Sequence, residues 1–514
     1  MSTATCPAIS VTKQSWISRS IGRPALFSVL MLLAACGGDN DPEVNSPLST
    51  PMAFVVNQDD TTLTTLRLDG KHSPVISTLS LGPAQPDAIG GIAVSLGEWI
   101  FVTNTSTNQV ATIDPIGGLV PILEDFLTEN PQDPRVKIGQ RPTRIYRDPV
   151  DKEVLWTMND GDPITGIDTV GNCSRGGSVS VLHNSHLGVG GEKPHISSFA
   201  CLSGKGAHFL AFSQPPAVAQ QLAFVSSQTT GLISVLLPVP TAGGNIGWSE
   251  FFVKIDLCDS AKETALGHSA CDGDATTPNH SAPVGMYWSP ATGKIYSYLA
   301  GYRSVVEINP GSLAIMRRID VSQFQNAEIT PDGRFLLVTG EDTTSDPTKM
   351  IGRFGLVDLT QPALTLVGHS LDHVRPAQFR FTPDGNRLYL TQWNVTIGLT
   401  PQQAASFQKD KLYVFDTATW PTSFPLLMSI DLSPVGSLGV HVLDVWVTGP
   451  NGAGSAKGVV VTNAPHSGNG SVSLIDATHH TITATIPVGK NPKQVTVYYT
   501  GLVASDNQAT PQVW

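Results

Sequence analysis

Charged side chains are scarce in this sequence, since Asp, Glu, Lys and Arg together make up 14% of its 514 residues. The basic ones are outnumbered, with 31 Lys and Arg against 42 Asp and Glu, so the formal net charge is −11. A protein that binds nucleic acid through a basic face has an excess of Lys and Arg over Asp and Glu. The composition therefore argues against nucleic acid as a partner.

Several catalytic and cofactor motifs are also missing. The sequence holds no GxSxG nucleophile elbow, no HExxH metal motif and no phosphate-binding P-loop. It also lacks CxxCH, which excludes a covalently attached c-type haem. The sequence thus points to no reaction by motif, and whether the protein is an enzyme stays open.

Beyond the N-terminus, no stretch is long and apolar enough to cross a membrane. The N-terminal stretch has the pattern of an export signal, with Lys13, Arg19 and Arg23 ahead of an apolar run over Ala25–Ala35. This run is too short for a membrane anchor, because spanning a bilayer takes ~20 apolar residues. Leu33–Cys36 (LAAC) resembles a bacterial lipobox. We therefore expect residues 1–35 to be a lipoprotein signal peptide and Cys36 to carry the lipid.

The residue after Cys36 bears on where such a lipoprotein resides. Gly37 stands where inner-membrane lipoproteins often have aspartate, which favours the outer membrane. Residues 36–51 are polar and include proline, which suits a flexible tether. The prediction is a cell-envelope protein on the outer membrane, facing either the periplasm or the cell surface, with lipid as its membrane contact.

The rest of the chain is rich in turn-forming residues, with 48 Gly and 38 Pro. The segment Gly458–Gly489 is representative, because three β-type runs follow one another in it: Val459–Thr462, Ser471–Asp476 and Thr481–Val488. Such a unit cannot bury both of its faces alone. It requires neighbours of its own kind.

Similar units recur along the chain. Each echo is a run such as FVTN or LYLT followed by a second alternating run, and the pairs are Phe101–Asn104 with Val110–Asp114, Lys294–Ser297 with Ser304–Ile308, and Arg387–Thr391 with Lys411–Asp416. Tight-turn sequences, Ser289–Gly293 and Thr382–Gly385, stand before two of these runs, and Thr330–Gly333 is a third of the same kind. Four short strands repeated about every 40 to 60 residues indicate a β-propeller.

The FVTN, VVTN and TPDG–LYLT–LYVFD patterns resemble the YVTN-type β-propeller repeats, over residues 52–500. That superfamily is related to lactonase-like propellers and to the haem d1 domain of cytochrome cd1-type nitrite reductases. The resemblance implies an all-β fold built as one propeller of four-stranded blades. It implies little about chemistry, because this scaffold hosts many functions.

The number of blades follows from the inner strands, which often open with proline. The candidates are Ala88–Ser95, Pro142–Asp148, Ala207–Ser213, Pro283–Ser289, Asn326–Pro331, Pro376–Pro383, Val440–Thr448 and Pro492–Thr500. The last has no strands after it, and the N-terminal runs Ala53–Val56, Thr62–Leu68 and Val75–Leu81 lack an inner strand. Joined, they close the ring and remove its free edges. This favours eight blades over 52–502 with a tail over 503–514; seven is the alternative if one weak inner strand is misassigned.

Long insertions are predicted at Gly161–Gly177, at Val395–Lys409 with a short helix near Pro401–Phe407, and around Gly243–Ser281. Four cysteines remain besides Cys6 and Cys36, and an even number in an exported chain indicates disulfides. We expect the pairs Cys173–Cys201 and Cys258–Cys271, each closing a long insertion in its own blade.

Histidines are the candidate ligand residues, because imidazole binds metals and serves as an axial haem ligand. The loop entering the inner strand and the loop from second to third strand open on one face, and six of the 13 histidines fall in or beside such loops: His208, His280, His369, His373, His441 and His466. The Pro-Asp-Gly turns lie on the opposite face. His183 and His186, like His479 and His480, are expected to be ordinary surface residues.

Three functions remain open. The first is a binding or scaffold propeller that presents its loop-rich face to a protein or small-molecule ligand. The second is a redox or metal-binding propeller whose histidines hold copper or a d1-type haem. Calcium is a weaker expectation, from Asp160-Gly161-Asp162 and Asp272-Gly273-Asp274, because turn formation explains both. The third is a lactonase-like hydrolase, although no cluster of carboxylates and histidines can be assembled for it from the sequence.

Overall fold

The computed structural model describes most of the chain after residue 50, in stretches that are separated by short gaps. These are residues 51–68, 74–85, 88–94, 99–114, 118–119, 135–151, 153–183, 194–206, 208–240, 246–321, 326–392, 398–406, 411–432, 443–447, 456–465 and 468–498. The predicted signal peptide, Cys36, the tether and the C-terminal tail lie outside them. No helix in these stretches is long and apolar enough to cross a membrane.

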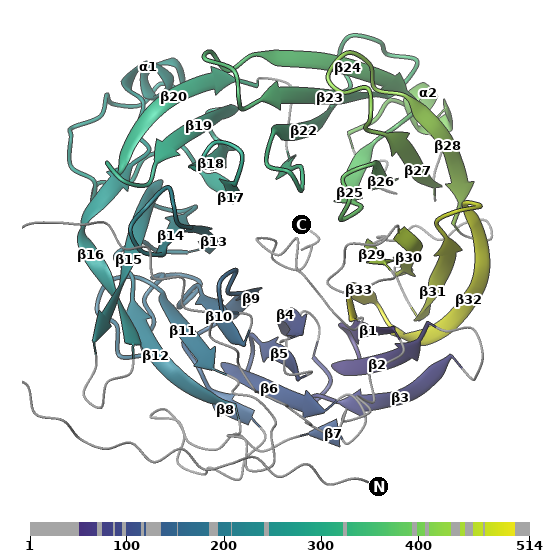
Figure 1. Cartoon of the computed structure of the whole chain (residues 1–514), viewed down its shortest axis with the longest axis horizontal. Helices are drawn as coiled ribbons and strands as arrows, with labels where there is room; N and C mark the ends of the chain where they lie inside the picture. Colours follow the sequence, from purple (N-terminus) through teal and green to yellow (C-terminus); the bar gives the residue numbers. More distant parts are fainter. Residues whose placement is uncertain are drawn as a thin grey trace, which may run out of the picture. The chain divides into compact units, whose positions relative to one another are not determined.

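The strands form eight antiparallel sheets arranged as blades around one axis (Figure 1). We number the blades from the N-terminal strands. Blade 1 combines β1 (Met52–Asn57), β2 (Thr62–Arg67) and β3 (Val75–Ser80) with β33 (Pro492–Tyr498). Blade 2 holds β4 (Ile89–Val94), β5 (Ile100–Asn104), β6 (Gln109–Asp114), β7 (Gly118–Leu119) and β8 (Arg135–Lys137).

The next three blades each use four consecutive strands. Blade 3 is β9 (Pro142–Arg147), β10 (Val154–Asn159), β11 (Ser178–His183) and β12 (His195–Cys201). Blade 4 is β13 (His208–Ser213), β14 (Leu222–Ser227), β15 (Leu232–Pro240) and β16 (Ile246–Asp256). Blade 5 is β17 (Pro283–Ser289), β18 (Lys294–Leu299), β19 (Ser304–Asn309) and β20 (Ala314–Asp320), and α1 (Ser260–Ala265) precedes it.

The last three blades follow the same plan. Blade 6 is β21 (Asn326–Ile329), β22 (Phe335–Asp342), β23 (Ile351–Asp358) and β24 (Leu366–Asp372). Blade 7 is β25 (Pro376–Phe381), β26 (Arg387–Gln392), β27 (Lys411–Asp416) and β28 (Leu426–Asp431), with α2 (Pro401–Ser406) between β26 and β27. Blade 8 is β29 (Leu443–Val447), β30 (Ala456–Asn463), β31 (Asn469–Asp476) and β32 (Thr481–Lys490).

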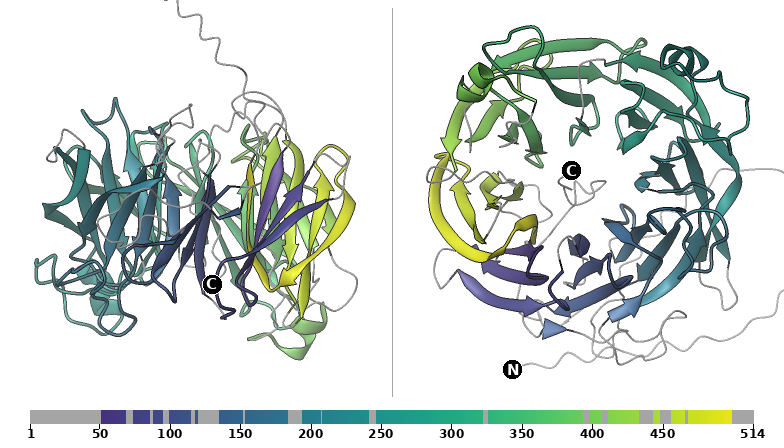
Figure 2. Two further views of the ribbon diagram at one scale, coloured as in Figure 1. Left: turned by 90° about the horizontal axis from the view of Figure 1, so that it is seen from below. Right: turned by 180° about the vertical axis from the view of Figure 1, so that it is seen from behind.

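The ring closes as the sequence predicts. The C-terminal strand β33 pairs with β1, in a register that joins Phe54 to Thr496, so the two ends of the chain complete one blade. Figure 2 shows the purple and yellow strands side by side in both views. The alternative of seven blades is wrong, because every expected inner strand is present.

The core is divided among the contacts between blades. The described residues form eight clusters of buried apolar side chains, and each cluster joins two neighbouring blades. Trp156 in blade 3 is fully buried and packs edge-on against Phe212 and Trp248 of blade 4. Its indole N–H donates to Asp148 at 3.1 Å, which satisfies the polar atom that burial removes from water.

The asparagine of the repeat motif ties one strand to the next. Asn159 ends β10, and its amide donates to the Ser178 and Ser180 hydroxyls of β11 at 2.9 and 3.1 Å. Asn463 at the end of β30 makes the same pair of bonds to Ser471 and Ser473, at 3.1 and 2.9 Å. The recurring asparagine therefore satisfies buried polar groups and is a structural residue in these blades.

The two faces of the ring differ in their loops. We call the face with the second-to-third connections and the loops into the inner strands the entry face; it carries residues 160–177, 257–282 and 343–350. The opposite turn face carries the tight turns, such as 290–293, 331–334 and 383–386. At one of them Thr330 donates to Asp332 at 2.6 Å and Gly333 has a φ of +71°, as Pro-Asp-Gly predicts.

Both predicted disulfides are present. Cys173–Cys201 links the second-to-third insertion of blade 3 to the end of its outer strand, and Cys258–Cys271 closes part of the connection from blade 4 to blade 5. The predicted insertions at 161–177 and 395–409 also connect second and third strands, and the second contains α2. The prediction for Gly243–Ser281 was partly wrong, because the 11-residue strand β16 occupies its first half.

Candidate functional site

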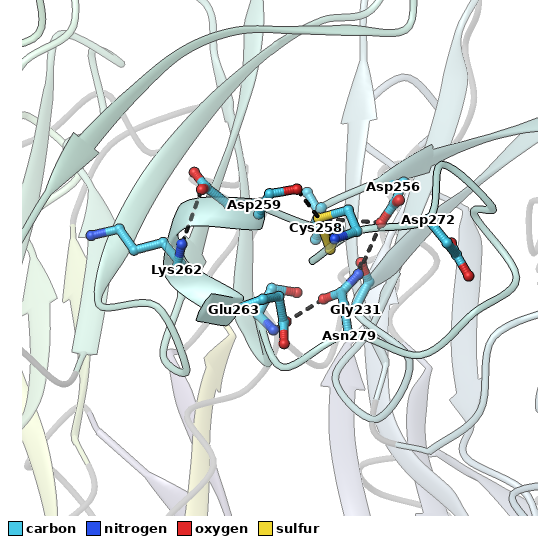
Figure 3. Close-up of a disulfide and its surroundings, with 12 residues drawn as sticks. Gly231, Asp256, Cys258, Asp259, Lys262, Glu263, Asp272 and Asn279 are labelled. Carbon is cyan, nitrogen blue, oxygen red and sulfur yellow. Dashed lines mark hydrogen bonds between the residues drawn. A yellow bond between two sulfur atoms is a disulfide. The ribbon is translucent and has the colours of Figure 1, made fainter. Parts of the chain in front are cut away.

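An extended loop of the entry face is the connection between β16 and β17, residues 257–282, which we call the stapled insertion. Its helix α1 begins at Ser260, where the Asp259 side chain accepts hydrogen bonds from the Ala261 and Lys262 amides at 3.1 and 3.2 Å. The Cys258–Cys271 disulfide then joins the two sides of the insertion (Figure 3).

The insertion is also bound to the blades beneath it. The Asn279 amide donates to Gly231 O and to the Asp256 carboxylate, each at 2.9 Å, and Figure 3 shows both bonds beside the disulfide. From blade 5, Arg318 donates to Leu257 O and Cys258 O, each at 3.2 Å. The segment is therefore held at its start, at its end and across its middle.

Glu263 on α1 is the buried centre of this insertion. Its carboxylate accepts hydrogen bonds from the Tyr302 hydroxyl, from the His280 amide at 2.7 Å and from His280 Nδ1 at 2.8 Å. Burial alone would raise the pKa of Glu263, but these hydrogen bonds outweigh it and lower the pKa to about 2. Glu263 is thus a carboxylate at any ordinary pH.

His280 is the half-exposed partner of that carboxylate. Because an ionised carboxylate can only accept, His280 Nδ1 must carry the proton, and Nε2 is then the atom left to accept a proton or bind a metal. Carboxylates orient metal-binding histidines in this way. Of the predicted ligand residues that the structure describes, His280 has the arrangement best suited to binding.

His268 stacks on His280, with ring centroids 3.6 Å apart and planes only 5° from parallel. The nitrogen lone pairs of an imidazole lie in its ring plane, so a metal ion in the plane of one ring lies outside the plane of the other. The pair therefore presents one oriented nitrogen and a flat polar surface, and it does not form a two-histidine chelate. No signal in the sequence marked His268, 12 residues before His280.

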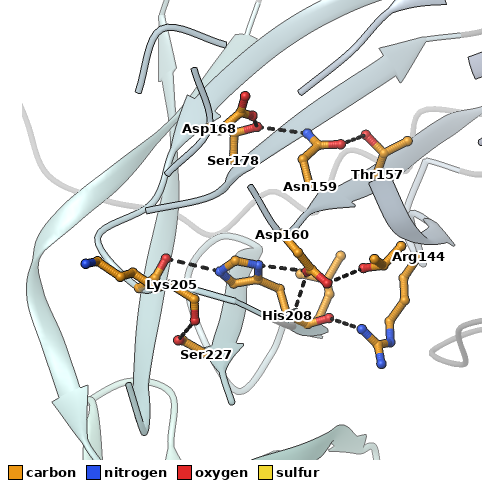
Figure 4. A network of polar contacts seen from close by, with 12 residues as sticks. Arg144, Thr157, Asn159, Asp160, Asp168, Ser178, Lys205, His208 and Ser227 are labelled. Carbon is orange, nitrogen blue, oxygen red and sulfur yellow. Dashed lines mark hydrogen bonds and ion pairs between the residues drawn. The ribbon is translucent and has the colours of Figure 1, made fainter. Parts of the chain in front are cut away.

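His208 lies at the start of the inner strand β13 and is fully buried. Its Nδ1 contacts the Asp160 carboxylate at 3.1 Å and its Nε2 contacts Gly204 O at 3.2 Å (Figure 4). Asp160 also accepts a hydrogen bond from the Thr143 hydroxyl at 2.8 Å, so this carboxylate is itself held by residues of the blade. With both ring nitrogens occupied, His208 holds blade 4 to blade 3 and offers no ligand atom.

His369 and His373 do not lie in one loop. His369 lies in the middle of the outer strand β24, and its ring stacks on Phe424 of blade 7 at 5.4 Å. His373 follows that strand with a φ of +64°, and its amide donates to Met350 O at 2.6 Å. His369 therefore lies within the strand and His373 beyond its end, so their spacing of four residues does not place them on one helix turn, where they could share a ligand.

The remaining predicted site residues either lie outside the described residues or form turns. His441, His466 and Cys36 lie outside the described residues, so their roles stay predictions. The aspartates considered for calcium serve turns: Asp162 accepts from the Ile164 and Thr165 amides at 2.9 and 2.8 Å, and Asp272 accepts from the Asp274 amide at 2.8 Å.

A second ordered patch of the entry face lies where blades 6 and 7 meet. The Gln403 amide on α2 donates to Thr343 O and Asp346 O, at 3.0 and 2.7 Å, and so joins the insertions of the two blades. Nearby, Arg375 makes a two-point ion pair with Glu341, at 2.5 and 3.0 Å. These contacts make the patch rigid, and its charges are already paired.

Sequence reasoning missed a line of charges on neighbouring inner strands. Arg380 of β25 lies 3.7 Å from Glu328 of β21 and 3.7 Å from Asp444 of β29. Asp444 also accepts the Val497 amide of β33 at 2.9 Å. The signal was opposite charges on adjacent inner strands, and the arrangement ties four blades together.

The comparisons with known proteins bear on the fold. No protein-family model matches the chain, and no curated protein matches it. Among solved structures, dihydro-heme d1 dehydrogenase NirN matches with a TM-score of 0.52 and 13% identity, covering 88% of this chain and 76% of NirN.

Two further solved structures are similar over almost their whole length. A putative 6-phosphogluconolactonase from Bacteroides fragilis has a TM-score of 0.47 and 12% identity, over 89% of this chain and 100% of its own. AztD from Citrobacter koseri has a TM-score of 0.45 and 14% identity, over 90% and 99%. At such low identity the likeness to NirN supports the propeller fold and carries no activity over to this chain.

Proposed function

We propose that this protein is a ligand-binding propeller of the cell envelope that takes its ligand at the entry face, on the stapled insertion. The observation that carries the proposal is the Glu263–His280 pair, an oriented and half-exposed imidazole on a buried carboxylate. Joining β16 to β17 needs only a few residues, as the connection between β24 and β25 illustrates. Long ordered connections in compact domains usually serve a function.

The chemistry of the pair limits what the ligand offers. His280 Nε2 can accept a hydrogen bond or bind a metal carried by the ligand, and the stacked ring of His268 provides a flat surface beside it. Leu266, at the end of α1, is half-exposed and adds an apolar contact. A protein loop or a small molecule with a polar group next to a planar or apolar one meets these requirements.

The envelope location rests on the lipobox at Leu33–Cys36. The two disulfides support it, since disulfides persist in oxidising compartments. Cys36 would carry the lipid and residues 36–51 would act as the tether to the outer membrane. Labelled palmitate should enter the wild-type chain and be absent from Cys36→Ala; label retained in that variant would refute the anchor.

The ligand itself can be sought by native mass spectrometry of the protein extracted from its own envelope without denaturation. Wild-type protein should carry extra mass or a stable partner, and His280→Ala should lose it. His479→Ala is the matched control, because His479 is an exposed histidine that also contacts a carboxylate, Asp476, at 3.2 Å. Loss in both variants, or no bound species at all, would contradict the proposal.

A haem- or copper-binding propeller is the second candidate, and its support is the oriented nitrogen of His280. NirN, of similar fold, was solved in complex with DHE. His280 fits a single axial or metal ligand, whereas His208 does not, because both of its ring nitrogens are hydrogen-bonded inside the fold. The spectrum and metal content of the natively extracted protein, with His280→Ala beside His479→Ala, distinguish this candidate from a metal-free ligand.

A further inference from the structure

A second group of candidate ligand side chains lies on the turn face of blade 3. The turn after β9 carries Asp151 and Glu153, and the strand pairing places Val154 directly opposite His183 at the end of β11. His183 in turn pairs with His195 at the start of β12. The antiparallel register thus brings two carboxylates from one turn and two imidazoles from two strands to one corner of the blade.

Three of these side chains converge. Ligand atoms of Asp151, Glu153 and His183 all lie within 4.8 Å of one another, and this is the only such group of three or more His, Cys, Asp or Glu in the described part of the chain. His183 Nε2 lies 3.9 Å from Asp151 Oδ2. The imidazole of His195 is adjacent, with its ring centroid 5.7 Å from that of His183.

The local backbone presets this arrangement. Asp151 Oδ1 accepts the Glu153 amide at 3.1 Å, which leaves Oδ2 on the side of His183. Asp151 O accepts the Val154 amide at 3.0 Å and closes the turn. Since the Asp151 side chain is 53% exposed and that of His183 is 31% exposed, an ion can reach the group from solvent.

We propose that Asp151, Glu153 and His183 form a binding site for a divalent transition-metal ion such as Zn²⁺, with His195 placed to complete it. Mixed nitrogen and oxygen donors suit zinc and its neighbours, whereas calcium takes oxygen ligands. Zinc bonds of about 2.0–2.1 Å set tetrahedral ligand separations near 3.3 Å, so ligand atoms that lie within 4.8 Å of one another must approach by at most roughly 1.5 Å per pair. Rotation of exposed side chains can supply this contraction.

Such an ion would clamp the turn after β9 to the β11–β12 pair. Because the ion would bind the folded chain only, it would stabilise that chain against thermal unfolding, and the stabilisation would grow with the logarithm of the ion concentration. Protons compete for both imidazole and carboxylate, so affinity should fall as the pH is lowered. The site lies on the face opposite the stapled insertion and is independent of the proposed function.

Calorimetric titration of Zn²⁺ into the full chain, stripped with chelator and with free thiols alkylated, tests the site. We expect one saturable site and a zinc-dependent rise in melting temperature. His183→Gln and the isosteric Asp151→Asn should each weaken binding about tenfold or more. His195→Ala should weaken it less.

His479→Ala is again the control, as an exposed histidine beside a carboxylate on the same face in blade 8. It should bind zinc as the wild type does. Asp151→Asn guards against misfolding, because an exposed amide of the same shape leaves the core intact. Absence of zinc binding by the wild type, or wild-type affinity in both His183→Gln and Asp151→Asn, would overturn the proposal.

Discussion

Two histidine–carboxylate groups lie on opposite faces of the ring and are built differently. At the entry face, His280 donates a hydrogen bond to the buried Glu263 carboxylate at 2.8 Å, so this carboxylate orients the imidazole ring. At the turn face, the carboxylate of Asp151 stays 3.9 Å from His183, and three side chains point at a common centre. The first group presents a single nitrogen outward, and the second brings ligand atoms of three side chains within 4.8 Å of one another.

The difference shows that a carboxylate beside a histidine does not define a metal site. Burial and hydrogen bonding decide whether the carboxylate orients the imidazole or competes to be a ligand itself. Glu263 accepts three hydrogen bonds, whereas Asp151 is half-exposed. We therefore expect the entry-face group to depend on the stability of its loop and the turn-face group to depend on its ligands alone.

The largest expected effect comes from removing the staple. Cys258→Ser with Cys271→Ser opens a loop with a sequence separation of 13 residues. The chain-entropy relation assigns such a loop about 3 kcal/mol of unfolding free energy. Denaturant unfolding should reveal this loss, and the zinc affinity of the turn-face group should not change. An unaltered unfolding curve would mean that the insertion does not need its staple.

Neutralising the buried carboxylate should have the next largest effect. Glu263→Gln keeps the shape but loses the charge that accepts from Tyr302 and His280, at a cost of about 1–3 kcal/mol. Asp151→Asn is the matched change at the other group and should cost less than about 0.5 kcal/mol, because the side chain is exposed. Equal losses in thermal unfolding would remove the distinction between the two groups.

The pH dependence of unfolding should also distinguish Glu263 from Asp151. The pKa of Glu263 falls from 4.5 to about 2 on folding, so its contribution is complete above pH 4.5 and is lost as the pH falls toward 2. Unfolding measured across that window should be less pH-dependent in Glu263→Gln than in the wild type. Asp151→Asn should follow the wild-type profile. A Glu263→Gln profile identical to wild type would show that the folded carboxylate has an ordinary pKa.

Much of the fold could be predicted from the sequence, because each blade repeats its own signals. Strand alternation, Pro-Asp-Gly turns and the lone strand at Pro492 determine the number of blades and their closure. The disulfide pairs followed from the positions of four cysteines. These features are local, or need only one long-range contact each.

The sites could be predicted only in part, because they depend on strand register and on burial. The entry-face loop of His280 was correctly located, but its stacking on His268 depends on how the insertion folds. His183 was taken for a surface residue, since nothing local shows that Val154 pairs with it and thereby brings Asp151 alongside. Loop proximity in sequence could not show that both ring nitrogens of His208 are hydrogen-bonded, or that the His369 ring stacks on Phe424.

The most direct test of the contrast is a zinc titration of His183→Gln and His280→Gln side by side, against the wild-type chain. Convergent ligands chelate and parallel rings do not, so His183→Gln should lose the zinc site and His280→Gln should keep it unchanged. The reverse result, with zinc binding lost in His280→Gln and retained in His183→Gln, would contradict the account.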